Sequence, residues 1–266
     1  KCLYPIGIHF AISQVLSYLG MYLLVKRTGA DISAYYRQVL LITGLTGILA
    51  SVPCVMLYRG DYIRRDRTGI TEGKITGSSL KIWEILEFLV IGAFLGQYGN
   101  MFVGMFQQYL NPEVYQETQS VISDGKSIWT LMLWMGIVAP FAEEVIFRWM
   151  TFLRMRDNMR VFSAAILSGL AFGIYHMNLL QGVYAAIMGT LFALLLEWRG
   201  NLFTSVLLHM GANIWSLVVT DVMLYLLDHF GAMYVITFNL VLVLFGAFGI
   251  WKTYRNYQKR KCTRVI

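Results

Sequence analysis

The chain has 266 residues, of which 57% are hydrophobic and 14% are charged, and its formal net charge at pH 7 is +7. An ordinary soluble domain carries about 25% charged residues, so the composition excludes a water-soluble domain of useful size. The basic residues flank apolar runs and do not alternate with aromatic residues on a polar face, so we expect a membrane protein and no nucleic-acid partner.

Apolar runs of about 20 residues recur along the chain, each long enough to cross about 30 Å of hydrocarbon as a helix. They predict an all-α, polytopic membrane protein, a bundle of about eight transmembrane helices. The expected spans are Leu3 to Val25, Val39 to Tyr58, Ile82 to Phe106, Ser127 to Phe152, Val161 to Met177, Gln181 to Trp198, Leu202 to Leu226 and Ala232 to Trp251. The polar segments Arg59 to Lys81 and Gln107 to Lys126 are expected to be loops, the second with a short surface helix.

Positive charge is distributed unequally between the two sides of this predicted bundle. Most lysines and arginines fall between Arg59 and Lys81, between Arg154 and Arg160, at Arg199, and in the tail from Lys252 to Arg264. Because cytoplasmic loops carry an excess of these residues, the pattern predicts that both termini are cytoplasmic, an N-in, C-in topology.

Ionisable side chains inside the spans need an explanation, because each costs about 2.5 to 3.5 kcal/mol to insert at the centre of a membrane helix. Such residues usually face a cavity or a charged partner. Together with one carboxamide, they are Glu143, Glu144 and Arg148 in the fourth span, His176 in the fifth, and His209 and Asn213 in the seventh. Three helices thus carry polar groups that can meet in one pocket. His9, in the first span, has no motif around it and is expected to form a hydrogen bond between helices.

The two adjacent carboxylates have different local surroundings. Glu144 and Arg148 stand one helical turn apart in the acid-first order that favours an ion pair. A structural ion pair is therefore the leading interpretation of these two residues, and direct catalysis by Glu144 is the alternative. Glu143 has Phe147 at the corresponding position, so it needs a partner on another helix or must stay protonated.

The depth of each group can be counted at about 1.5 Å per residue. This count places Glu143 and Asn213 at nearly the same level, with His176 on one side of that level and His209 on the other. Straight helices would bring the groups close without contact. A tilt, or a break near Pro140 or Gly173, would have to close the gap.

The residue types in this predicted pocket suit one class of chemistry. A buried carboxylate beside an imidazole can hold and deprotonate a water molecule. An imidazole and a carboxamide can donate hydrogen bonds to a developing oxyanion. The combination predicts hydrolysis of an amide without a covalent acyl-enzyme, and it requires no cofactor.

Three motifs in separate spans carry these residues: "EEVIFR", "FGIYH" and "HMGAN". In this order they resemble the signature of the CPBP intramembrane proteases, the CaaX protease and bacteriocin-processing family that is also called Abi. The family pattern is Glu-Glu-x-x-x-Arg, then Phe-x-x-x-His, then His-x-x-x-Asn. The resemblance extends from Glu143 to Asn213 and implies a metal-independent glutamic protease of the membrane.

The resemblance also implies a role for each matching residue. Glu143 would activate water, with His176 holding or sharing that water, and His209 with Asn213 would form the oxyanion site. Supporting roles fall to Glu144 and Arg148, which would brace the first motif, and to Phe172, which opens the second.

Family members act on membrane-associated peptides or lipidated proteins, so such a substrate and the lipid bilayer are the expected partners. We expect an integral protein of a bacterial cell membrane. It would form one membrane domain over residues 1–266, with a catalytic core over 127–226 and accessory spans and loops over 1–126.

Two other classes of function stay open at this point. A zinc hydrolase would use His176, His209 and a glutamate as a three-ligand set, although the chain has no His-Glu-x-x-His helix. A non-catalytic bacteriocin-immunity or scaffold protein would bind a peptide or an enzyme and keep the pocket without using it.

Overall fold

The computed structural model describes residues 2–29, 32–68, 75, 79–106, 113, 120, 123 and 125–263. Within these ranges the chain forms helices and short turns, with no β-strand. The all-α prediction is therefore confirmed for the described part of the chain. The surface helix expected between 107 and 126 falls almost wholly outside it.

Seven described helices are long and apolar enough to cross a membrane, which confirms the polytopic prediction. Six of them are α1 (Tyr4–Arg27), α2 (Ile32–Thr68), α3 (Ile82–Gly104), α9 (Leu179–Arg199), α10 (Phe203–Phe230) and α11 (Ala232–Thr263). The seventh is a continuous helical rod made of α5 (Ile128–Leu131), η2 (Met132–Val138), α6 (Ala139–Glu144), η3 (Val145–Phe152) and α7 (Leu153–Arg156). The remaining predicted span, Val161 to Met177, corresponds to α8 (Val161–Tyr175), which has only 15 residues.

Two helices continue well beyond the predicted spans. The expected loop at Arg59 is wrong for residues 59–68, because α2 runs on to Thr68. Likewise the basic tail after Lys252 is helical as far as Thr263. An apolar run marks only the part of a helix that lies in hydrocarbon. The polar turns of α2 are held instead by tertiary ion pairs, Asp61 with Arg154 and Arg65 with Asp157.

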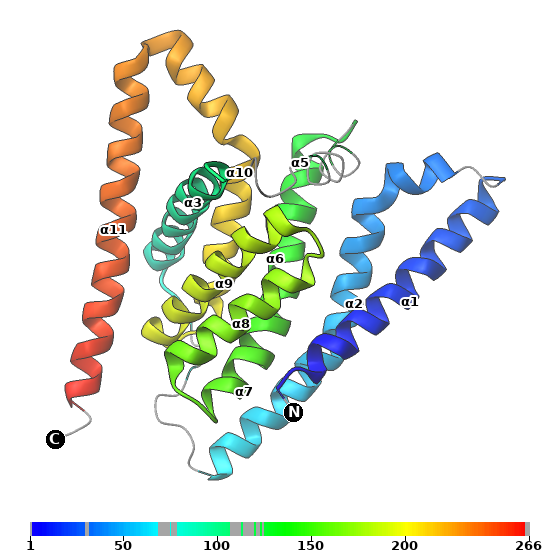
Figure 1. Cartoon of the computed structure of the whole chain (residues 1–266), viewed down its shortest axis with the longest axis horizontal. Coiled ribbons are helices and arrows are strands. Elements are labelled where there is room, and N and C mark those ends of the chain that lie inside the picture. The colour runs from blue at the N-terminus through cyan, green and yellow to red at the C-terminus, as the bar shows by residue number, and fades with distance from the viewer. Residues whose placement is uncertain are drawn as a thin grey trace.

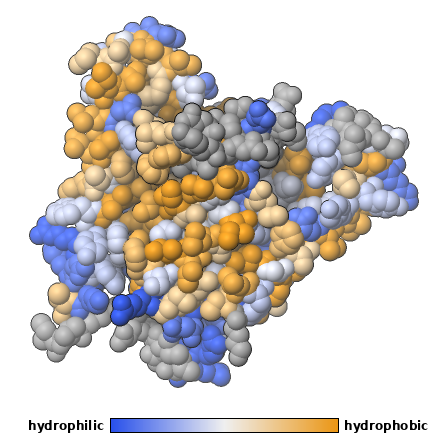
Figure 2. Space-filling view, in the orientation of Figure 1, coloured by the Kyte–Doolittle hydropathy of each residue, from blue (hydrophilic) through white to orange (hydrophobic). Residues whose placement is uncertain are grey.

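The helices pack as two outer hairpins around a central group (Figure 1). The α1–α2 hairpin lies on one side and the α10–α11 pair on the other. The α5–α7 rod stands between them, with α8 and α9 in front. The chain enters α1 and leaves α11 at the same end of the bundle, at the bottom of Figure 1. On this face, apolar residues dominate the middle and hydrophilic residues gather toward the lower end (Figure 2).

Ion pairs cluster at that lower end, which we call the basic end and define by the last turns of α2, α7, α9 and α11 and the first turns of α3. The pairs are Arg154–Asp61, Arg65–Asp157, Arg156–Glu197, Arg199–Glu84 and Lys252–Glu87. Charged residues in a membrane protein favour the water interface. The basic end is therefore one boundary of the membrane-embedded region.

Glycines let α3 and α10 approach closely. A Cβ atom at Gly92 would lie 2.1 Å from the backbone oxygen of Leu208, and one at Gly211 would lie 2.2 Å from that of Leu89. Small residues allow such backbone contact, which is a main source of helix association in membranes. His209 lies between the two contact points, so this crossing fixes the position of its backbone.

A substitution at Gly92 tests this contact. We expect Gly92→Ala to lower the unfolding temperature of the purified protein in detergent. The added methyl meets a backbone carbonyl that no rotamer change can relieve, and overpacking of this kind costs about 1–3 kcal/mol. Gly104→Ala, on the same helix with no atom within 4 Å of its added Cβ, is the control for helix propensity. Equal unfolding temperatures for both variants would contradict the close crossing.

Candidate active site

The rod that carries the first motif departs from α-helical geometry on both sides of α6. η2 and η3 are π-helical, so their backbone bonds run from residue i+5 to residue i. Such segments are rare and occur frequently at functional sites. They change the rotation per residue, and therefore the direction in which Glu143 and Glu144 point. This departure from α-helical geometry lies next to Pro140, one of the two positions where a break in the helix was predicted.

Pro140 explains a contact made by Asn213. The N–H of Ala139 donates to the oxygen of Trp134, five residues earlier. The same pattern would pair residue 140 with Met135, but proline has no N–H to donate. Instead the Asn213 side-chain Nδ2 donates to the oxygen of Met135 at 2.9 Å. The proline thus leaves a backbone acceptor that ties α10 to η2.

The imidazole of His209 lies between the two adjacent carboxylates. His209 Nδ1 donates to Glu144 Oε1 at 2.9 Å, and His209 Nε2 lies 3.6 Å from Glu143 Oε2. Glu143 thus finds its partner on another helix, as the lack of a local partner predicted. The depth count from straight helices missed the contact, because it did not include the π-helical segments.

The two carboxylates differ in their access to the surroundings. The side chain of Glu144 is fully buried, whereas that of Glu143 is 24% exposed. The buried Ser205 lies close to Glu144. Of the two carboxylates that contact His209, Glu143 is therefore the one that can reach water or a peptide bond.

Arg148 balances the charge of Glu144 from within the protein. Its side chain is fully buried, and its Nε lies 3.2 Å from Glu144 Oε2. The guanidinium carbon lies 4.5 Å from the ring centre of Phe172 and 5.7 Å from that of Phe192, so aromatic faces supply cation–π attraction. Gly189 leaves room for it, since a Cβ there would lie 2.8 Å from Arg148 Nη2.

Phe172 links the second motif to this group. Its ring contacts Arg148 and lies 5.6 Å from the ring of His209 and 4.7 Å from that of His176. His176 follows the last turn of α8, where its Nδ1 donates to the oxygen of Phe172 at 2.9 Å. Among the described residues, no hydrogen bond or ion pair joins His176 directly to Glu143.

The structure therefore brings Glu143, Glu144 and His209 into one cluster, with Arg148 and Phe172 against it. Asn213 lies one turn further along α10 and is hydrogen-bonded to η2. Within the described part of the chain, His176 is linked to the cluster through Phe172.

Three residues near the cluster were outside the predicted site. Ser205 stands one turn before His209 on α10, so the i,i+4 spacing used for Asn213 would have found it in the opposite direction. Tyr175 precedes His176, and its hydroxyl lies 3.0 Å from His9 Nδ1. His9 Nε2 donates to the oxygen of Gly47 at 3.1 Å, which confirms His9 as a residue that joins helices. No sequence pattern indicated that this link would end beside the second motif.

Comparisons with known proteins address the same part of the chain. The family model described as type II CAAX prenyl endopeptidase Rce1-like matches residues 125–215. These residues include every motif position from Glu143 to Asn213. The match covers about a third of the chain and supports the CPBP resemblance of the three motifs.

A curated relative extends the similarity beyond residues 125–215. The chain is 21% identical over 212 residues to the protein named "Putative membrane peptidase YdiL" of Bacillus subtilis (strain 168), covering 79% of this chain and 85% of the relative. No solved structure matches the chain. At the family level, these similarities support a membrane protease.

Removing one member of the buried Glu144–Arg148 ion pair should destabilise the protein. We expect Arg148→Met to cost about 3–5 kcal/mol of folding free energy, because it leaves the Glu144 carboxylate buried without its cation. The double variant Glu144→Gln with Arg148→Met should recover much of that loss, since no buried charge remains. The measurement is the free energy of unfolding in mixed detergent micelles. A double variant that is less stable than Arg148→Met would contradict the charge argument.

Replacing Pro140 tests the contact between η2 and Asn213. In Pro140→Ala a new N–H can donate to Met135 and displace the Asn213 side chain. We expect proteolytic turnover to fall by about 10²-fold, the effect of a small misplacement of a catalytic group, without a lower unfolding temperature. Pro53→Ala, at the proline inside α2, is the control. A similar loss of turnover from both variants would show that the effect is a general one of helix prolines.

Proposed function

We propose that the chain is an intramembrane endopeptidase of the CPBP type, which hydrolyses a peptide bond in a membrane-associated or lipidated peptide or protein. The observation that carries the proposal is the unequal burial of the two carboxylates on His209. The side chain of Glu144 is fully buried against Arg148, whereas the side chain of Glu143 is partly exposed. A general base must reach the water that it deprotonates, and Glu143 satisfies that requirement.

In the proposed reaction Glu143 accepts a proton from a water molecule as the water oxygen attacks the carbonyl carbon of the substrate. The carbonyl oxygen becomes an oxyanion in a tetrahedral intermediate. Glu143 then returns the proton to the amide nitrogen as the carbon–nitrogen bond breaks, which releases an amine and a carboxylic acid that keeps the second proton of the water. The proton balance is closed without any other group.

His209 and Asn213 are the proposed donors to the oxyanion. Glu144 accepts the Nδ1 proton of His209, which orients the ring so that Nε2 faces Glu143. In this role Nε2 must carry a proton, through which it donates a hydrogen bond to the oxyanion. The Asn213 amide has two N–H groups, of which one donates to Met135 and the other serves the substrate. Preorganised donors of this kind typically contribute about 10²–10³-fold in rate each.

His176 is proposed to hold the attacking water. Its Nδ1 is occupied by the Phe172 oxygen, which leaves Nε2 as the nitrogen available for a water molecule or substrate. Approach of His176 to Glu143 by way of a shared water is the arrangement that the family resemblance implies.

We propose a single membrane domain over residues 1–266, with a catalytic core over 127–226 and accessory spans before it. Both termini would be cytoplasmic, because the basic end holds the start of α1 and the end of α11. The name and source of the Bacillus relative support a bacterial cell membrane, and the description of the matching family supports a lipidated substrate. The alternative, a small peptide such as a bacteriocin precursor, rests on the family resemblance of the three motifs alone.

The proposal predicts which carboxylate is essential. We expect Glu143→Gln to abolish peptide release while the protein remains abundant and folded in membranes, because an amide cannot accept the proton from water. Asp221→Asn, which neutralises an exposed carboxylate on α10, should keep full activity. The measurement compares peptides released from membranes by mass spectrometry, with Glu144→Gln beside them. Full processing by Glu143→Gln would rule out the proposed base and favour an immunity or scaffold function.

The same membranes test the dependence on metal. A metal-independent glutamic protease keeps its activity after metal is removed by a chelator. Loss of activity on chelation that returns with zinc would favour the zinc hydrolase, in which His176, His209 and a glutamate bind the ion.

A further inference from the structure

A groove on the α11 flank of the bundle, away from the α1–α2 hairpin, has an apolar lining. It lies between α3, α9 and α11 and has a volume of about 580 Å³. Its walls are Phe94, Trp198, Ala247, Ile250, Trp251 and Tyr254. Four of these six side chains are aromatic, and the groove contains no charged side chain. It is therefore suited to a hydrocarbon chain.

A second pocket of about 390 Å³ adjoins the groove, and Trp198 lines both. In contrast to the groove, this pocket is charged. Its cationic side chains are Arg199, Lys252, Lys259 and Arg260, and its carboxylates are Glu84 and Glu87. Four positive charges against two negative charges leave a surplus of positive charge in the pocket.

The ion pairs of the pocket show where the surplus lies. Glu84 is paired with Arg199 at 2.6 Å, and Glu87 with Lys252 at 2.8 Å. Both carboxylates are thus neutralised by neighbours. Lys259 and Arg260 are the other two cations that line the pocket, about two turns beyond Lys252 on α11. Arg260 also donates to the backbone oxygens of Trp198 and Arg199 at the end of α9, which holds its guanidinium at the pocket.

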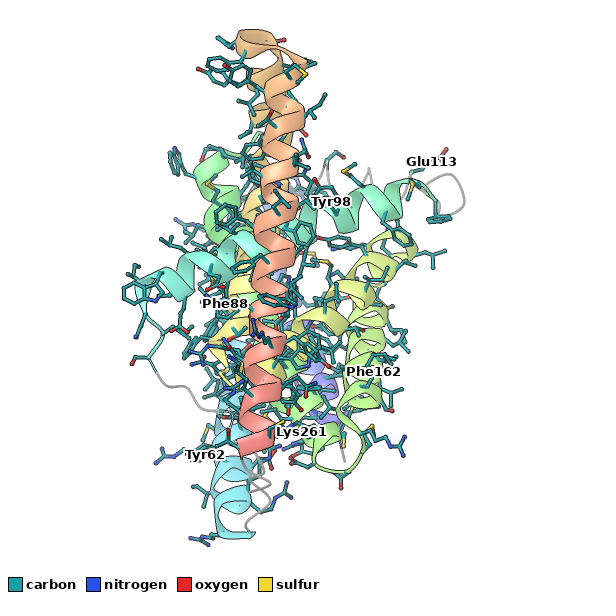
Figure 3. The ribbon with its side chains drawn as sticks, turned by 90° about the vertical axis from the view of Figure 1, so that its left-hand side faces the viewer. Tyr62, Phe88, Tyr98, Glu113, Phe162 and Lys261 are labelled. Atoms are coloured by element: carbon teal, nitrogen blue, oxygen red, sulfur yellow. The ribbon has the colours of Figure 1, made fainter. Side chains whose placement is uncertain are left out.

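The two compartments follow one another along the helices. On α11 the groove uses residues 247–254 and the pocket uses residues 252–260. On α3 the groove uses Phe94, and the pocket uses Glu84, Glu87 and Phe88. Figure 3 shows this flank, with Phe88 beside α11 and Lys261 near the lower end of that helix. The charged pocket therefore lies at the basic end, and the apolar groove lies deeper in the bundle.

We propose that this groove and pocket together bind one anionic phospholipid of the surrounding bilayer. The phosphate lies in the pocket near Lys259 and Arg260, and an acyl chain follows the groove past Trp251 and Ala247. The order of the two compartments matches a lipid whose headgroup lies at the membrane surface. The surplus of positive charge selects a lipid with net negative charge over a zwitterionic one, since each nearby Lys or Arg adds about 1 kcal/mol of attraction. None of the residues proposed for catalysis lines either compartment.

The test measures lipid binding to the full chain by native mass spectrometry in a neutral detergent. Phosphatidylglycerol is compared with phosphatidylcholine of the same acyl chains and with glycerol 3-phosphate as a soluble headgroup. Lys259→Gln removes a pocket charge, and Lys261→Gln removes a charge from the same helix outside the pocket. Ala247→Trp fills the groove. None of these variants touches the proposed catalytic groups, so failure of the protease proposal leaves the measurement unaffected.

We expect phosphatidylglycerol to bind more tightly than phosphatidylcholine, and Lys259→Gln to weaken its binding about fivefold. Lys261→Gln should leave it unchanged, and Ala247→Trp should reduce binding of the lipid. Equal weakening by both lysine variants would overturn the site in favour of diffuse surface charge. Equal binding of the two lipids, or equally tight binding of glycerol 3-phosphate, would also overturn it. If Ala247→Trp fails to fold, the comparison of Lys259→Gln with Lys261→Gln still tests whether the lipid binds in the pocket.

Discussion

Three charged groups and one imidazole share a small volume inside the bundle, and the rest of the site is arranged around their balance. Burying an isolated carboxylate is costly, so Glu144 requires Arg148, and the guanidinium in turn requires the aromatic faces of Phe172 and Phe192. Once Glu144 is fixed, its remaining oxygen orients His209. The ring then presents its other nitrogen to Glu143. The buried pair is thus a support for the more exposed residue.

The scaffold meets these requirements through backbone features more than through side chains. Glycines at the α3–α10 crossing hold His209 close to the rod, and Gly189 leaves space for the guanidinium. Pro140 leaves the Met135 oxygen without a helical donor, and Asn213 uses it. In each case a missing atom, a Cβ or an N–H, allows a polar group from a neighbouring helix to approach. The positions of the catalytic candidates are therefore set by residues that have no chemistry of their own.

Much of this arrangement was predictable from the sequence. Apolar runs located the spans, and the i,i+4 spacing of Glu144 and Arg148 predicted their ion pair, because both depend on local properties of one helix. The contact between His209 and both carboxylates depends on the rotation of α6 relative to α10, which two π-helical segments change. The polar ends of α2 and α11 also escaped prediction. Their helical form depends on contacts with Arg154, Glu87 and the end of α9. A hydropathy profile contains no information on such contacts between helices.

The short helix α8 has a consequence for the bilayer itself. Its 15 residues rise about 22 Å, whereas the hydrocarbon core of a membrane is about 30 Å thick. A helix with this mismatch draws the lipid surface inward or leaves polar headgroups and water above its end. His176 stands at that end, where α8 turns into α9. In the proposed reaction, this mismatch would shorten the path by which water, which hydrocarbon excludes, enters from the membrane surface opposite the basic end.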